Sequence, residues 1–304
     1  IDARGHRLTV SLPERPLIVD GDVTRLAQVV SNLLSNAAKY TDEGGRIDIA
    51  LEGQDLEADQ DVRSVLKASS RTGGGAAAVR RPGMLKQDQP VNVTASHLVY
   101  DSANGKATYT GDARLWQGET AVQGQTIVLD DKQGNLTATG GVRSSWRLLD
   151  TDPKTKVSEV KTTVATGAEL VYEDDQRRAT YTTDARLNGP EGDLRAQKIE
   201  LYLAPSGDPL GRLGAYTDVT LHTEGRESAG ARLSYFAADD RYVMSTAPGA
   251  PDVRILEQLA RECRETLGKT LTFHRATDTI AVDGSDERRT QTISGGKCPE
   301  PRAK

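Results

Sequence analysis

The sequence predicts a mainly β protein whose strands are arranged in repeats, preceded by a short α/β segment at the N-terminus. Two copies of one pattern, residues 98–115 and 170–187, align without a gap at an offset of 72 residues. Turn-forming residues recur about every 8 to 12 residues, the strand spacing of a β-sandwich, barrel or β-roll. Only 4% of the 304 residues are aromatic, so the interior must be built mainly from small and β-branched side chains.

Composition and charge exclude several classes of function. The net charge is −5 and residues of both signs are interspersed, so the sequence offers no broad basic face for nucleic acid. No apolar run approaches the roughly 18 residues of a membrane-spanning helix. The chain begins at Ile1 with neither a methionine nor a signal peptide, and we therefore expect a fragment or a processed form.

Cysteine and histidine usage gives no sign of a metal site. The sequence has no Cys-x-x-Cys pair and its four histidines are scattered, so we predict no metal and no cofactor. The two cysteines, Cys263 and Cys298, suit one disulfide in an oxidising compartment and equally two free thiols.

Residues 22–40 have the periodicity of an amphipathic helix. Asp22 is a suitable N-cap. The apolar residues that follow fall on one stripe: Leu26, Val29, Val30, Leu33, Leu34 and Ala37. A second face is polar and includes Asn32, Asn36 and Lys39. By itself this pattern is typical of a surface helix with a solvated polar face.

The run NLLSNAAKYT (32–41) resembles the N box of the ATP-binding domain of sensor histidine kinases. The resemblance implies that Asn36 holds a Mg²⁺ ion and that Lys39 approaches a phosphate. It also places Asn32 at the position of the general base in ATP-hydrolysing relatives.

The glycine-rich loops that complete such a nucleotide site have no counterpart in this sequence. RTGGGAAAV (71–79) lacks an aspartate before its glycines, and VDGSDE (282–287) lacks spaced glycines. We therefore expect residues 1–45 to be a truncated, vestigial fragment of a histidine-kinase-type ATPase domain. An ATP-binding module of a two-component sensor histidine kinase is the alternative function.

The repeats begin before the first complete copy. Five residues recur at an offset of 80, because Leu56, Ala58, Val62, Arg63 and Ser64 match Leu136, Ala138, Val142, Arg143 and Ser144. The kinase-like segment stands where the start of that earlier repeat belongs, which indicates a chimera. We expect residues 46–65 to be the tail of an incomplete repeat, residues 66–90 a flexible linker, and residues 150–163 a second linker.

Each complete repeat reads as alternating strands separated by turns. In the first copy the strands are HLVYD (97–101), KATYTGDARLWQ (106–117), TAVQGQTIVLD (120–130) and NLTATGGVRSS (135–145). The alternation gives one moderately apolar face of small residues. Such a face either fills an ordinary core or leaves an elongated apolar cleft.

With these repeats, residues 54–300 resemble the OstA/LptA domain family of lipopolysaccharide transport. The motifs are an A-x-x-L-x-Y opening, a Y-x-G-x-A-x-L middle and an L-x-A-x-G-x-V close, in repeats at about 91–146, 167–221 and, in degenerate form, 228–296. The resemblance implies that residues 91–304 form a β-jelly roll, V-shaped in section, with lipid acyl chains in its groove.

The resemblance also implies a non-enzymatic, periplasmic protein that binds lipopolysaccharide and pairs end to end with other β-jelly rolls, or with itself, by strand addition. No catalytic residue is expected. The groove candidates, each equally compatible with ordinary core packing, are Leu98, Tyr100, Leu115, Ile127, Leu129, Leu170, Tyr172, Leu187, Ile199 and Leu201. Arg114 and Arg186 occupy matching positions and either meet lipid phosphates or form cross-strand ion pairs.

Overall fold

The computed structural model describes residues 5–11, 23–40, 43–50, 56–66, 80–151, 155, 158–190, 192–204, 210–259, 262–284, 289–295 and 298. The chain divides into two compact units, residues 1–56 with 101–103, and residues 57–100 with 104–304.

The N-terminal unit is a small β–α–β arrangement. Strands β1 (Arg7–Ser11) and β2 (Arg46–Ala50) pair in parallel, and helix α1 (Val23–Tyr40) lies between them in sequence. Parallel strands need such a crossover, and the helix confirms the one predicted from the apolar stripe. Because β2 pairs with β1, it belongs to this unit and not to the tail of a repeat, and the boundary lies about ten residues later than the predicted residue 45. Among the described residues, no helix is long and apolar enough to span a membrane.

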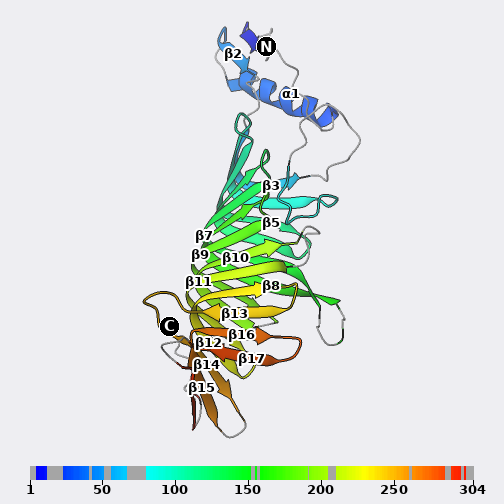
Figure 1. Cartoon of the computed structure of the whole chain (residues 1–304). Coiled ribbons are helices and arrows are strands. Elements are labelled where there is room, and N and C mark those ends of the chain that lie inside the picture. The colour runs from blue at the N-terminus through cyan, green and yellow to red at the C-terminus, as the bar shows by residue number, and fades with distance from the viewer. Residues whose placement is uncertain are drawn as a thin grey trace. The chain divides into compact units, whose positions relative to one another are not determined.

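The second unit is one large antiparallel sheet of 16 strands, which confirms the predicted mainly β class (Figure 1). The strands are β3 (Leu56–Leu66), β4 (Val91–Asp101), β5 (Lys106–Gln117), β6 (Thr120–Asp130), β7 (Asn135–Thr151), β8 (Ser158–Glu173), β9 (Arg178–Gly189), β10 (Gly192–Leu203), β11 (Leu210–Thr223), β12 (Arg226–Phe236), β13 (Arg241–Ser245), β14 (Val253–Gln258), β15 (Cys263–Gly268), β16 (Thr270–His274), β17 (Thr279–Asp283) and β18 (Gln291–Ser294).

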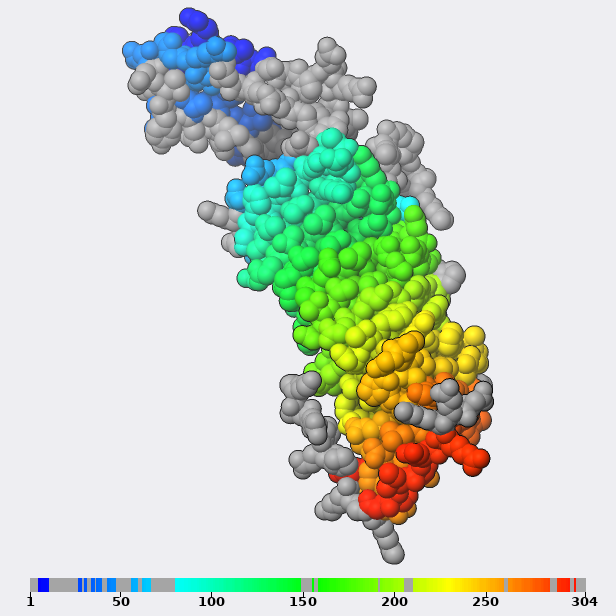
Figure 2. Space-filling model, turned by 60° about the vertical axis from the view of Figure 1, so that its left-hand side comes forward, coloured from blue at the N-terminus to red at the C-terminus, as the bar shows by residue number. Residues whose placement is uncertain are grey.

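Strands that are consecutive in sequence are neighbours in the sheet from β3 to β13. The space-filling view shows the same order as a continuous change of colour along this unit, from cyan through green to yellow (Figure 2). Short turns join most of these strands, as expected for antiparallel hairpins.

Alternate strands bend sharply in their middles. Two consecutive residues of β5, β7, β9 and β11 have positive φ: Gly111 and Asp112, Gly140 and Gly141, Thr183 and Asp184, Thr217 and Asp218. The pairing register shifts at each of these places, which is the signature of a β-bulge. Side chains before and after each bend contribute to one hydrophobic cluster, so each bend turns the strand around the core.

The bends explain the repeated sequence motif. TGDA, TGGV, TTDA and YTDV are the four stretches that contain these residue pairs. Glycine adopts positive φ without a steric penalty, whereas threonine is branched at Cβ and rarely does so. Gly140 has a second reason to be glycine, because an added Cβ would lie 2.5 Å from Cβ of Gln125.

The repeat is also visible in the core. Buried Tyr109 on β5 is hydrogen-bonded to Ser64 on β3, and buried Tyr181 on β9 lies 2.6 Å from the Ser144 hydroxyl on β7. Ser64 and Ser144 are the residues matched at an offset of 80 in the sequence. Strand β3 therefore occupies the place in its repeat that β7 occupies in the next.

The described part of each predicted linker is ordered. Residues 67–79 lie outside the described residues, but residues 80–90 pack on the sheet, with Leu85 buried and Arg80 donating to Asp174 over 2.9 Å. Residues 158–163 belong to β8, which pairs with β7 along the length of both strands.

Candidate binding cavity at the branch point of the sheet

Strand β12 divides the sheet into two branches. Its first residues, Arg226–Ala229, pair with β14, whereas Arg232–Phe236 pair with β13. One branch continues through β13, β16 and β17, and the other through β14, β15 and β18. Gly230 lies between these two stretches of β12, and an added Cβ there would lie 2.7 Å from Cγ of Met244. The glycine therefore leaves room for a side chain of the first branch.

A cavity of about 590 Å³ opens between the branches. This volume lies within the range of about 300–1,000 Å³ that is usual for small-molecule sites. Both branches, strand β7 and strands β9 to β12 contribute apolar side chains: Leu148, Leu187, Leu194, Leu210, Leu213, Leu221, Leu233, Tyr235, Tyr242, Met244, Ile255, Leu259, Leu271, Phe273 and Ile280. The interior is therefore mainly hydrocarbon.

Aromatic rings form one wall of the cavity. Tyr235 and Tyr242 face each other across β12 and β13 with ring centroids 4.6 Å apart, and Phe273 on β16 follows at 6.1 Å from Tyr242. The Tyr235 hydroxyl donates to Asp240 over 3.2 Å, so its polar end is satisfied outside the apolar space. Rings held in this way present a large, rigid apolar surface at little entropic cost.

Charged side chains lie among the residues that line the cavity. Arg226 donates to Asp278 over 2.8 Å, lies 3.5 Å from Glu257, and has its guanidinium 5.6 Å from the Phe273 ring centroid. The hydrogen bond to Asp278 raises the pKa of Arg226, so the side chain is held in its charged form. The carboxylates of Asp278 and Glu257 offset this charge. An apolar interior with charged side chains among its lining residues suits an amphiphile, with alkyl groups inside and a polar group near Arg226.

The structure separates the predicted groove residues from this cavity, with one exception. Only Leu187 is among the lining residues. Eight others are buried in the core farther along the sheet: Leu98, Leu115, Ile127, Leu129, Leu170, Tyr172, Ile199 and Leu201. Tyr100 is partly buried and donates to Asp131 over 2.7 Å. Burial is compatible with both ordinary core packing and a lipid groove, so the assignment of these nine residues to a groove stays a prediction.

Sequence reasoning missed the aromatic wall because it followed the two well-preserved repeats. Tyr235, Tyr242 and Phe273 lie in the degenerate third repeat, where the family motif fades. A usable signal was present, since this region holds both phenylalanines of the chain, Phe236 and Phe273, in alternating stretches.

The two matched arginines have different partners. Arg186 forms a bidentate pair with Asp193 over 2.6 and 2.8 Å, the cross-strand alternative predicted from the sequence. The Asp193 carboxylate raises the pKa of Arg186. Arg114 instead places its guanidinium 5.3 Å from the Trp116 ring centroid.

The kinase-like residues lie on α1. Lys39 is exposed, while the side chains of Asn32 and Asn36 lie outside what the structure describes. Their assignment as vestigial nucleotide or Mg²⁺ ligands stays a prediction.

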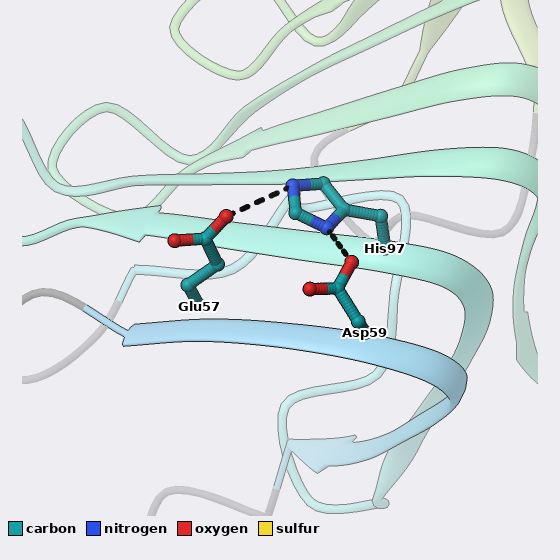
Figure 3. A group of neighbouring side chains, drawn as sticks. All are labelled: Glu57, Asp59 and His97. Carbon is teal, nitrogen blue, oxygen red and sulfur yellow. Dashed lines mark hydrogen bonds and ion pairs between the residues drawn. The ribbon is translucent and has the colours of Figure 1, made fainter.

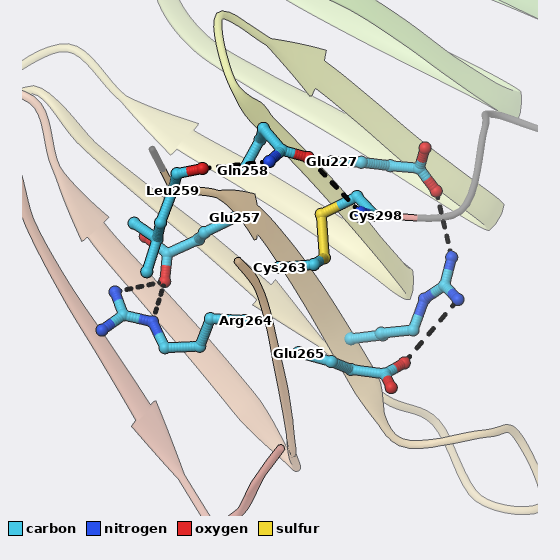
Figure 4. Close-up of a disulfide and its surroundings, with 9 residues drawn as sticks. Glu227, Glu257, Gln258, Leu259, Cys263, Arg264, Glu265 and Cys298 are labelled. Carbon is cyan, nitrogen blue, oxygen red and sulfur yellow. Dashed lines mark hydrogen bonds and ion pairs between the residues drawn. A yellow bond between two sulfur atoms is a disulfide. The ribbon is translucent and has the colours of Figure 1, made fainter. Parts of the chain in front are cut away.

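Cys263 and Cys298 form a disulfide with their Cα atoms 4.8 Å apart (Figure 4). Cys263 begins β15, directly opposite Gln258, which lines the cavity. The Gln258 side-chain oxygen accepts a hydrogen bond from the Cys298 backbone over 3.4 Å. The bond therefore fixes the end of the branch that contains β14, β15 and β18.

Comparison with known proteins supports the resemblance over part of the chain. Residues 92–206 match the family described as LptA/(LptD N-terminal domain) LPS transport protein. No curated protein matched. A crystal structure of LptH, the LptA-homologous periplasmic component of the lipopolysaccharide transport device of Pseudomonas aeruginosa, has 26% identity over 38% of this chain and 76% of that chain. The TM-score of this match is 0.32. Residues 92–206, which comprise β4 to β10, are therefore similar to the LptA and LptD N-terminal domain family of lipopolysaccharide transport proteins.

Proposed function

We propose that this chain binds lipopolysaccharide without catalysing a reaction and carries it across the periplasm as part of a protein bridge. The observation that carries the proposal is the apolar cavity between the two branches of a sheet that contains a match to this transport family. Lipid acyl chains occupy the cavity, where they exchange water for the aromatic wall and the surrounding leucines.

The charged residues beside the cavity orient the lipid. Lipid A carries phosphate groups next to its acyl chains, and Arg226 places a positive charge beside the apolar interior. Its partners Asp278 and Glu257 keep the guanidinium ordered in the free protein. A lipid phosphate binds there by taking the place of one of these carboxylates as the partner of the guanidinium, with which it forms a charge-assisted hydrogen bond.

The proposed partners are other β-jelly rolls of the same transport system, or further copies of this chain. Strand β3 ends the sheet on one side, and β17 and β18 end its two branches on the other. Val65 on β3 and Ile293 on β18 are each 59% exposed. An edge strand with unpaired backbone groups and an exposed apolar side chain is suited to strand addition by a neighbour.

The disulfide supports a location outside the cytoplasm. Disulfides persist in oxidising compartments such as the bacterial periplasm and are rare where thiols are kept reduced. Cys263 and Cys298 are bonded here, in agreement with the proposed place of action.

A photocrosslinking experiment tests the lipid site with adjacent residues of one strand. Tyr235 lines the cavity, whereas Phe236 points to the opposite face, where it packs against Arg212 and Arg241. We expect p-benzoylphenylalanine at position 235 to crosslink lipopolysaccharide in cells and the same probe at position 236 to give no adduct. Equal labelling at both positions, or none at 235 in a folded protein, would contradict the proposal.

A further inference from the structure

A cluster of metal-ligating side chains lies at the other end of the sheet from the cavity. Glu57 and Asp59 project from the same side of β3, and His97 projects between them from the neighbouring strand β4 (Figure 3). The side chains of Glu57, Asp59 and His97 are 71%, 69% and 32% exposed. One ligand atom of each lies within 4.8 Å of the others.

The two carboxylates lie near different nitrogens of the His97 ring, Asp59 near Nδ1 and Glu57 near Nε2. Asp59 lies 2.5 Å from Nδ1 of His97, a hydrogen bond that puts the ring proton on Nδ1 and leaves the lone pair on Nε2. Carboxylate contact with one ring nitrogen is the usual support of a histidine that binds a metal through the other.

The distance on the Nε2 side fits an ion better than a direct contact. Nε2 and the Glu57 carboxylate are 3.8 Å apart, which is too long for a hydrogen bond. Two ligands that each lie about 2.0–2.2 Å from one zinc ion can be separated by roughly 3.3 to 4 Å. The gap between Nε2 and Glu57 therefore has the size that a shared ion requires.

We propose that His97 Nε2 and Glu57 bind a zinc ion, with Asp59 as the residue that orients His97, and with water in the remaining positions. An imidazole with a carboxylate is a donor set that favours zinc over magnesium or calcium, which prefer oxygen alone. Sequence patterns did not reveal the site, because the two ligands lie 40 residues apart on neighbouring strands and form no compact motif. The site is independent of the lipid cavity.

Zinc titration of the intact protein by calorimetry, with single-residue variants, tests the site. We expect saturable binding that is absent in His97→Ala and Glu57→Gln and about 10- to 100-fold weaker in Asp59→Asn. The matched control is His222→Ala, because His222 also meets a carboxylate, Glu227 at 3.1 Å, but no second one is placed at its other nitrogen. This variant should bind zinc as the parent does, and magnesium should not compete.

Two results would overturn the assignment. The parent protein would show no saturable zinc binding if His97 is simply an imidazolium held between two carboxylates. Binding that survives His97→Ala would place the ion elsewhere. If His97→Ala does not fold, zinc-induced movement of the His97 ring resonances in the parent protein, with those of His222 unmoved, decides the question.

Discussion

Tyr181 is a fully buried tyrosine whose hydroxyl has two side-chain partners. Its hydroxyl lies 2.6 Å from the Ser144 hydroxyl and accepts from the Trp146 indole over 2.7 Å. Burial raises the pKa of Tyr181 well above its usual range, so the phenol stays neutral and serves as a hydrogen-bonding hub between β7 and β9. The network links β7 to β9 through their side chains, in addition to the backbone pairing of each strand with β8.

Removal of the Tyr181 hydroxyl should therefore be costly. We expect Tyr181→Phe to lower the free energy of unfolding by about 1–3 kcal/mol, because the Trp146 indole and Ser144 hydroxyl lose a buried partner. Tyr100→Phe is the comparison, since that hydroxyl donates to Asp131 in a partly exposed place. Urea denaturation of both variants measures the difference, and equal losses would show that the buried network adds nothing.

Glu200 is a buried carboxylate on the outer face of β10. It accepts hydrogen bonds from Lys198 over 3.0 Å and from the hydroxyls of Tyr202 and Tyr216 over 2.9 Å each. Gly214 makes this possible, because an added Cβ there would lie 2.7 Å from the Tyr216 hydroxyl. Burial alone would raise the pKa of Glu200, but the three donors outweigh it and the pKa lies below its ordinary value.

The lowered pKa of Glu200 makes a definite prediction about acid. A carboxylate with a depressed folded-state pKa adds stability above its unfolded pKa of about 4.3, and that stability is lost as the pH falls through the folded value. We expect Glu200→Gln to be less stable than the parent at neutral pH, with the gap closing below about pH 4. Thermal unfolding of both proteins at a series of pH values measures this difference in stability. A difference that does not change with pH would mean that the charge of Glu200 does not contribute to stability.

At the scale of elements, the bends in β5, β7, β9 and β11 decide the architecture. A straight 12- to 17-residue strand would carry its apolar side chains away from the core, whereas a bulge returns the chain to it. In β7 the bend consists of two adjacent glycines that differ in surroundings. Gly140 lies against the side chain of Gln125, and Gly141 has nothing within 4 Å of the position of an added Cβ.

This pair of glycines separates backbone strain from crowding. We expect Gly141→Ala to lower the free energy of unfolding by about 1–2 kcal/mol, the cost of positive φ for a residue with a Cβ. Gly140→Ala has the same backbone cost and must also displace Gln125, so its loss should be larger. Chemical denaturation compares them, and a Gly140→Ala protein as stable as Gly141→Ala would show that Gln125 moves aside freely.

Much of the element-scale structure was predictable, and the failures have physical causes. The repeat, the hairpins and helix α1 follow from periodicity and turn residues, which are local signals. The branch at β12 was not predictable, because pairing of one strand with both β13 and β14 depends on contacts distant in sequence. The cavity depends on that branch, so its lining residues, apart from Leu187, were not predicted from the sequence.

At the scale of the whole molecule, the two units have separate interiors. The hydrophobic cluster of the sheet includes Ala58, Val62 and many later residues, and among the described residues it includes none from 1–56. We expect a chain that begins at residue 57 to keep the thermal midpoint and the lipid crosslinking of the full chain. A large drop in either, measured by circular dichroism and by the probe at position 235, would show that the N-terminal unit supports the sheet.

The sequential order of the strands has a consequence for how such a molecule can change in size. Strands β4 to β7 and β8 to β11 are successive copies of one four-strand unit, and each strand pairs with the strands before and after it in the chain. Duplication of one unit of 72 residues would add four strand widths, about 19 Å. Every strand would still pair with the strands before and after it in the chain. A single genetic duplication can thus lengthen the sheet by one unit, while the branched end that holds the cavity stays unchanged.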